Sequence, residues 1–111
     1  MTDSWTWLCR RARVGSGKVY EGVGEKFRSV EVREVHRKVV LMHLGSCANP
    51  AGEAWPSLET MAVELGLSRR SVRRAVDSLV VHGFMERQRR PNQSTTYRLN
   101  RYALEEADPL R

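Results

Sequence analysis

The sequence predicts a mainly α-helical α+β fold in which three helices are followed by a β-hairpin. Two observations lead to this prediction. Between residues 29 and 83, apolar residues recur at the 3.6-residue period of helices, and turns that contain glycine or proline interrupt them. After Gly83 the period changes to two, which is the period of strands. The 111 residues suffice for one domain and are too few for two cores.

A long first helix is expected to begin near Ser29. Serine is a good N-cap residue, and Glu31 and Glu34 follow in or just past the positive first turn. A 3, 4, 3 spacing predicts its inner face: Val32, Val35, Val39 and Met42. Three further apolar residues widen this face: Val40, Leu41 and Leu44. The helix ends before Pro50, which cannot continue it.

Two shorter helices are predicted after the turn at residues 49–52. Ser57 caps the first of them, and Gly66 ends it. Ser68 caps the second, and Gly83 ends it. The inner faces are the apolar residues at helical spacing: Leu58, Met61, Ala62 and Leu65 in the first, and Val72, Ala75, Val76, Leu79 and Val80 in the second. Joined by a three-residue turn, the pair forms a helix-turn-helix.

The segment after Gly83 predicts a hairpin of two strands, residues 84–89 and 95–99, with a polar turn between them. Ala54-Trp55 could add to this small sheet. The whole is a winged helix-turn-helix, with a three-helix core and a C-terminal β-hairpin wing. We assign residues 29–102 to this domain, residues 1–28 to a flexible basic N-terminal arm and residues 103–111 to a polar C-terminal tail.

The net charge of +6 is concentrated in one third of the chain. Residues 66–102 contain nine arginines and two acids, a charge of +7, whereas the ten basic and eleven acidic residues elsewhere sum to −1. A solvated protein surface would mix the two signs. Arginine offers a planar fork of donors that suits phosphate oxygens and guanine edges, so this segregation favours a nucleic-acid partner.

The arginines can be placed on the predicted elements. On the third helix, projected at about 100° per residue, Arg70 and Arg74 lie opposite the core and Arg73 lies at its edge. We expect these three to contact base edges in the major groove. The start of that helix is expected to receive phosphates through Ser68, Arg69 and Ser71. The expected wing contacts are Arg87, Arg89, Arg90, Asn92 and Gln93. The only acid near enough in sequence to neutralise the wing arginines is Glu86, which is expected to point to the other face of the strand.

Four segments resemble a widespread bacterial winged-helix family. They are Lys38-Val39-Val40-Leu41-Met42-His43-Leu44-Gly45-Ser46-Cys47-Ala48-Asn49, Trp55-Pro56-Ser57-Leu58-Glu59-Thr60-Met61-Ala62, Leu65-Gly66-Leu67-Ser68-Arg69-Arg70-Ser71-Val72 and Gly83-Phe84-Met85. That family occurs in phage and plasmid replication initiators and in small mobile-element regulators, and the resemblance implies DNA binding.

We therefore expect a sequence-specific protein that binds double-stranded DNA and regulates transcription. One alternative is a replication or recombination accessory protein of a phage or plasmid that uses the same surface. Another is a winged-helix protein-interaction module, which would not need four arginines at the start of its third helix. One recognition helix reads only a few base pairs, so we expect a homodimer or tandem binding. Trp5 and Trp7 could form a dimer contact or cover the core.

We expect that the protein is not an enzyme and that it binds no metal, cofactor or small-molecule effector. The candidate soft ligands lack C-x-x-C or H-x-x-x-H spacing: Cys9, His36, His43, Cys47 and His82. No apolar run approaches the ~18–20 residues that would span a bilayer. The first residues also lack the charge order of a signal peptide, so we expect a cytoplasmic protein with no membrane partner.

Overall fold

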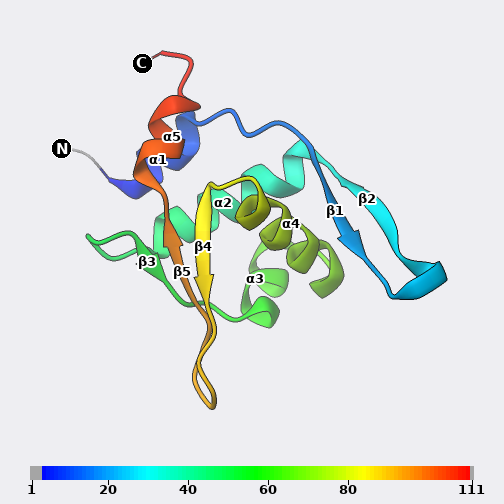
Figure 1. The fold of residues 1–111 in the computed structure, drawn as a ribbon. Coiled ribbons are helices and arrows are strands. Elements are labelled where there is room, and N and C mark those ends of the chain that lie inside the picture. The colour runs from blue at the N-terminus through cyan, green and yellow to red at the C-terminus, as the bar shows by residue number, and fades with distance from the viewer. Residues whose placement is uncertain (1–3, 111) are drawn as a thin grey trace.

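The computed structural model describes residues 4–110 and combines helices with two small antiparallel sheets (Figure 1). In chain order the elements are α1 (Trp5–Arg11), β1 (Gly17–Glu21), the 3-10 turn η1 (Gly24–Lys26), β2 (Arg28–Val32), α2 (Glu34–Cys47), β3 (Glu53–Ala54), α3 (Leu58–Leu65), α4 (Arg69–Val81), β4 (Met85–Gln88), β5 (Thr96–Leu99) and α5 (Arg101–Glu106). The predicted fold class is confirmed: an α+β domain with a helix-turn-helix and a β wing. Within residues 4–110, no helix is both long and apolar enough to cross a bilayer.

Helices α2, α3 and α4 form the three-helix core, and local signals define where α3 and α4 begin and end. The Ser57 Oγ atom accepts a hydrogen bond from the Thr60 amide, and α3 ends at Gly66, whose φ of 68° is left-handed. The predicted caps of both short helices are confirmed. Inside the core, all three helices contribute side chains with no exposed area: Val40, Leu41, Leu44, Met61, Val72, Ala75 and Leu79.

The wing is a hairpin of β4 and β5, with the two-residue strand β3 on the other edge of β5. Met85 pairs with Leu99 and Gln88 with Thr96, so residues 89–95 extend past the sheet. Met85 and Leu99 are buried against the core and anchor the hairpin. Both predicted strands are confirmed, although each is shorter than expected, and β3 joins the sheet near the predicted position.

The predicted start of the long helix at Ser29 is wrong. Residues 28–32 form β2, which pairs with β1 in a register that places Gly17 opposite Val32 and Glu21 opposite Arg28. Helix α2 begins only at Glu34. The predicted inner face of this helix also differs from the buried face of α2. Val35 was expected on the inner face but is half exposed, whereas the buried residues of α2 include Arg37, Val40 and Leu41. Alternating apolar residues in residues 28–32 follow the strand period and explain the difference.

The N-terminal segment also differs from the expected flexible arm. Helix α1 packs on α2 and buries Leu8 and Cys9. The Lys38 Nζ atom donates hydrogen bonds to the carbonyls of Cys9 (2.9 Å), Arg10 (2.7 Å) and Ala12. It thereby provides hydrogen-bond donors for carbonyl groups at the C-terminal end of α1 that lack partners within the helix. Burial raises the pKa of the Cys9 thiol to about 12.

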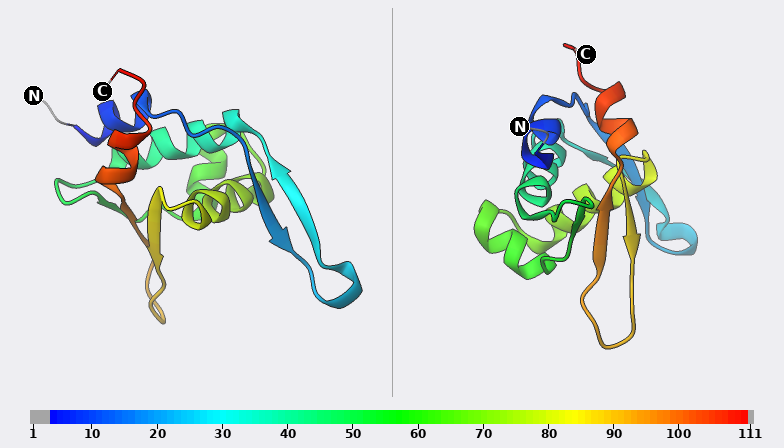
Figure 2. Two further views of the ribbon diagram at one scale, coloured as in Figure 1. Left: turned by 45° about the horizontal axis from the view of Figure 1, so that its top comes forward. Right: turned by 90° about the vertical axis from the view of Figure 1, so that its left-hand side faces the viewer.

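The expected polar tail is also attached to this layer. Helix α5 lies beside α1 in Figure 2, and its Leu104 is fully buried. The Arg13 amide donates to the Ala107 carbonyl at 2.9 Å, and Arg11 forms an ion pair with Asp108 at 3.1 Å. The ends of the described chain therefore pack against each other, and α1 joins them to α2.

The two N-terminal tryptophans do not share a face, because α1 is a helix and residues i and i+2 diverge on it. The Trp5 Nε1 atom donates to the Pro50 carbonyl at 3.2 Å, and its ring lies over Gly52. The Trp7 side chain is 40% exposed and stacks with the Arg11 guanidinium, which lies 4.2 Å from the ring centroid. Trp5 is thus used in packing within the chain.

We predict that Gly45→Ala destabilises the protein by ~1–3 kcal/mol. In a solvent-exposed helix the same change stabilises by up to ~1 kcal/mol, so the sign of the effect is informative. Here an added Cβ would lie 2.8 Å from Cys9 Sγ and 3.0 Å from the Trp5 carbonyl oxygen. Urea unfolding measures the change. The exposed neighbour Ser46 supplies the control Ser46→Ala, with an expected effect within ~0.5 kcal/mol. A more stable Gly45→Ala protein would show that α1 does not pack here.

Candidate nucleic-acid interface

Helix α4 places arginines outward because its opposite face is anchored in the core. Val72, Val76 and Leu79 have at most 1% exposure, as the helical spacing predicts. Each such side chain contributes ~1.5–3 kcal/mol of burial free energy, which fixes the rotation of the helix about its axis. Arg69 and Arg70 are consequently exposed on its first turn.

The two serines at the start of α4 are used for capping. The Ser68 Oγ atom accepts a hydrogen bond from the Ser71 amide at 3.0 Å and donates one to Ser71 Oγ at 3.0 Å. These bonds hold the first turn in place and thereby fix the points from which Arg69 and Arg70 leave the backbone. The phosphate contacts expected of Ser68 and Ser71 stay a prediction.

Arg74 does not point into open solvent. Its side chain is 21% exposed and lies against β1, where Nε is 3.2 Å from Glu21 Oε2 and Nη2 is 2.5 Å from Glu21 Oε1. This two-point contact is the strong form of an arginine–carboxylate pair. The Arg74 hydrogen bond lowers the pKa of Glu21, and the same bond raises the pKa of Arg74. Both groups are therefore charged at neutral pH.

Glu21 also forms longer ion pairs with two further arginines. Arg28 Nη2 lies 3.6 Å from Glu21 Oε1, and Arg73 Nη2 lies 3.9 Å from Glu21 Oε2. The Arg73 side chain remains half exposed. Sequence reasoning missed Glu21 because 53 residues separate it from Arg74. The available signal was the alternation of apolar and polar residues on both sides of the Gly22–Gly24 turn, which is typical of a hairpin.

The wing also contains both an arginine that is paired with a carboxylate and arginines that are not. Arg87 Nη1 lies 2.6 Å from Asp77 Oδ1 of α4, so the expectation that no acid neutralises Arg87 is wrong. The reason is that β4 returns alongside α4 after Gly83. Four predicted contact residues are exposed in the part of the wing beyond β4: Arg89, Arg90, Asn92 and Gln93. Within residues 4–110, Arg89 and Arg90 have no ion-pair partner.

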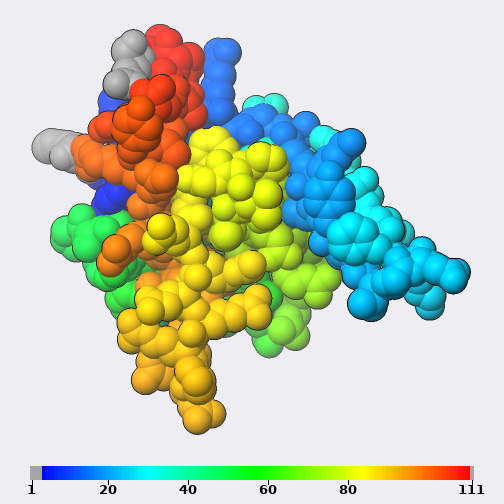
Figure 3. Space-filling view, in the orientation of Figure 1, coloured from blue at the N-terminus to red at the C-terminus, as the bar shows by residue number. Residues whose placement is uncertain are grey.

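A hollow of about 430 Å³ lies between α4, the start of α3 and the wing. Four predicted contact residues line it: Arg69, Arg73, Arg87 and Arg89. The space-filling view shows the wing projecting from one side of the molecule and the β1–β2 hairpin from another, with α4 between them (Figure 3). Among the described residues, no three His, Cys, Asp or Glu side chains gather as metal ligands would. The arrangement suits an extended polyanion.

We predict that the Glu21–Arg74 pair makes stability depend on pH in the acid range. Because the pKa of folded Glu21 is lowered, the stabilisation is complete above the ordinary glutamate pKa and is lost as the pH falls through the folded value. Glu21→Gln should therefore be less stable than wild type at pH 7, and the difference should shrink as the pH falls below the ordinary glutamate pKa.

Thermal unfolding across this range measures the effect, and Glu25→Gln is the control on the same hairpin. Within residues 4–110, Glu25 has no ion-pair partner, so this variant should follow wild type at each pH. An equal deficit of Glu21→Gln at pH 7 and pH 3 would contradict the prediction.

A protein-family model described as "Helix-turn-helix domain" matches residues 37–85, from α2 to the first residue of β4. No curated protein matches the chain, and no solved structure does. The matched segment contains α3, the turn at Gly66 and all of α4. Residues 37–85 are therefore a helix-turn-helix domain, and a domain of this kind implies DNA binding.

Proposed function

We propose that the chain is a sequence-specific protein that binds double-stranded DNA and regulates transcription. In this proposal α4 enters the major groove, and the wing lies on the backbone or in the minor groove. The observation that carries it is the exposed arginine surface of α4, made of Arg69, Arg70 and Arg73, with the unpaired Arg89 and Arg90 of the wing beside it. A helix with this surface fits the major groove in width and charge.

The arginines of α4 have different roles in the proposal. Arg70 and Arg73 read base edges, and each bidentate contact with guanine supplies ~1–3 kcal/mol of discrimination. Arg69 binds a phosphate near the positive start of the helix that Ser68 caps, and the Ser71 hydroxyl donates a hydrogen bond to the same phosphate. Arg74 is the least available of the three residues expected to read bases, because a base contact must first break its pair with Glu21.

We further propose that two copies bind together, as a homodimer or in tandem. A single recognition helix covers only a few base pairs, which is too little for high specificity. The selected DNA sites should then be palindromic or directly repeated, and binding should saturate at two chains per site. Promoters that carry the selected site in front of a reporter gene test the regulatory role, because expression should then depend on this protein.

We predict that Arg70→Ala reduces preference for the selected site more than affinity for random duplex. Base contacts specify the sequence, whereas phosphate contacts position the protein. The measurement is a pair of dissociation constants, one for a site selected from random duplexes and one for a scrambled duplex. The expected loss of discrimination is ~5- to 150-fold, which corresponds to ~1–3 kcal/mol.

Arg10→Ala is the matched control for Arg70→Ala. Arg10 is exposed on α1, away from the first turn of α4, and its removal changes the charge by the same amount (Figure 1). Its site preference should equal that of wild type. Equal losses on both duplexes for Arg70→Ala would mean that this residue contacts only the backbone.

We predict that the Arg89→Ala/Arg90→Ala double variant flattens the plot of log K against log salt by ~1.8, since each phosphate contact contributes ~0.9 to the slope. Arg87→Ala should change the slope much less, because Asp77 already neutralises Arg87. Folding should be nearly unaffected in the double variant, as exposed charges contribute little to stability. Unchanged slope in the double variant would show that the wing stays off the DNA.

A further inference from the structure

We propose that the β1–β2 hairpin is a second DNA-contacting arm, which binds the phosphodiester backbone on the side of α4 opposite the wing. This inference rests on the proposed function and adds a surface that lies outside the matched helix-turn-helix segment. The residues that would bind phosphate are Lys26 and Arg28, next to Arg73 of α4. The hairpin is residues 17–32, with η1 at its tip.

The hairpin is held firmly against the recognition helix. Val19 and Val32 are each 4% exposed, and the Glu21 carboxylate joins β1 to Arg74 of α4. At the far end, the rings of Tyr20 and Phe27 stack with centroids 5.9 Å apart and planes within 9°. These contacts fix the direction of the arm. Its backbone therefore loses little conformational entropy when its charged side chains bind a ligand.

The two faces of the hairpin differ in what they carry. Successive strand residues point to opposite sides, and Glu21 pairs directly with Arg28. One face, shared by Val19, Glu21 and Arg28, is turned towards α4. The other face carries Lys18 and Tyr20. Only the first face lies beside the arginines of the recognition helix.

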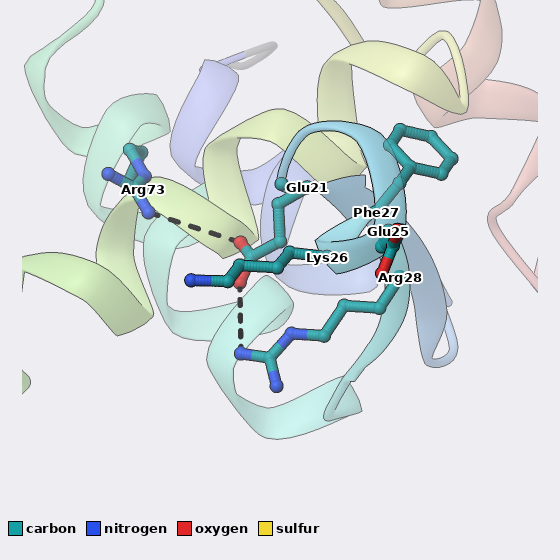
Figure 4. Close-up of a pocket in the computed structure, with 7 residues that line it drawn as sticks. Glu21, Glu25, Lys26, Phe27, Arg28 and Arg73 are labelled. Carbon is teal, nitrogen blue, oxygen red and sulfur yellow. Dashed lines mark ion pairs between the residues drawn. The ribbon is translucent and has the colours of Figure 1, made fainter.

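Cationic groups converge on the side of the hairpin that faces α4. A hollow of about 560 Å³ is lined by Lys26, Arg28 and Arg73 together with Glu21 and Glu25. Figure 4 shows Arg28 and Arg73 pointing at the Glu21 carboxylate from different directions, with the Lys26 side chain extending past it in the same hollow. With Arg74, the four cations and two carboxylates leave a local charge of +2.

These cations keep donors for a further anion. Arg74 makes the short contact with Glu21. The Nη2 atoms of Arg28 and Arg73 lie 3.6 and 3.9 Å from the nearer oxygens of the same carboxylate. An arginine has five N–H donors, and most of those on Arg28 and Arg73 are unused. Lys26 has no ion-pair partner among residues 4–110. A phosphate at this hollow would meet several charge-assisted donors at once.

DNA geometry supplies the reason for an arm on this side. A helix in the major groove has a sugar–phosphate backbone on each side, because the groove is only ~12 Å wide. The wing and the β1–β2 hairpin project on opposite sides of α4 (Figures 1 and 3). When the wing meets one backbone, the hollow beside Lys26 is placed towards the other.

The test compares two lysines of the same hairpin. Lys26 lies on the α4 side, Lys18 lies on the opposite face, and both are exposed. Lys26→Ala should lower the slope of log K against log salt by ~0.9, and a Lys26→Ala/Arg28→Ala variant should lower it by up to ~1.8. Lys18→Ala should leave the slope at the wild-type value. Site preference should be unchanged in all three, because phosphate contacts do not specify sequence.

The outcomes separate this inference from the proposed function. Indistinguishable slopes for Lys26→Ala and Lys18→Ala, in a protein that still requires Arg70 for site preference, would overturn the arm and leave the proposed function standing. Binding of an acidic protein that depends on Lys26, without any change in the DNA slope, would also overturn it. A wild-type protein that binds no duplex would overturn both. Because the Lys26 variant removes no ion pair among the described residues, loss of folding does not confound the comparison.

Discussion

One ion pair joins helix α4 to the β1–β2 hairpin, and a second joins it to the wing. The geometry of the candidate interface depends on these two contacts. Arg74 pairs with Glu21 of β1, and Asp77, three residues further along α4, pairs with Arg87 of β4. All four side chains are 21–34% exposed, so solvent screening limits what each pair adds to stability. Their main effect is orientation: the buried valines fix the rotation of α4, and the pairs fix the direction of each hairpin relative to it.

The same pairs divide the arginines into two groups. Arginines at the junctions between α4 and the hairpins are neutralised by a carboxylate, as Arg74 and Arg87 are. Arginines at the start of α4 and at the wing tip, such as Arg70 and Arg90, have no such partner among residues 4–110. Positive charge is thereby concentrated on outward-facing positions. An approaching duplex would meet the unpaired group first, and the paired group would contribute mainly to the long-range field.

The parts of the fold that the sequence predicts are those with local causes. Ser57, Gly66 and Ser68 define the ends of α3 and α4 through bonds within a few residues, and the change of period after Gly83 marks the wing. The first hairpin was not predicted, because the N-cap signal of Ser29 competes with the strand pattern around it. The Glu21–Arg74 pair had no local signal at all, since it forms only after the hairpin packs across α4. Local patterns therefore located the arginines of the site but not their partners.

A residue outside the helix-turn-helix thus determines which arginines of α4 are paired with a carboxylate. The matched segment is residues 37–85, yet Glu21 precedes it by sixteen residues and contacts two of its arginines. A helix with the same α4 sequence but no carboxylate at this place would present Arg74 unpaired to the DNA. It would gain phosphate affinity that does not depend on sequence, and specificity would fall because base contacts would supply a smaller share of the binding energy. In the proposed function, the hairpin would therefore contribute to discrimination by keeping the charge of Arg74 paired with Glu21, in addition to any phosphate that it binds itself.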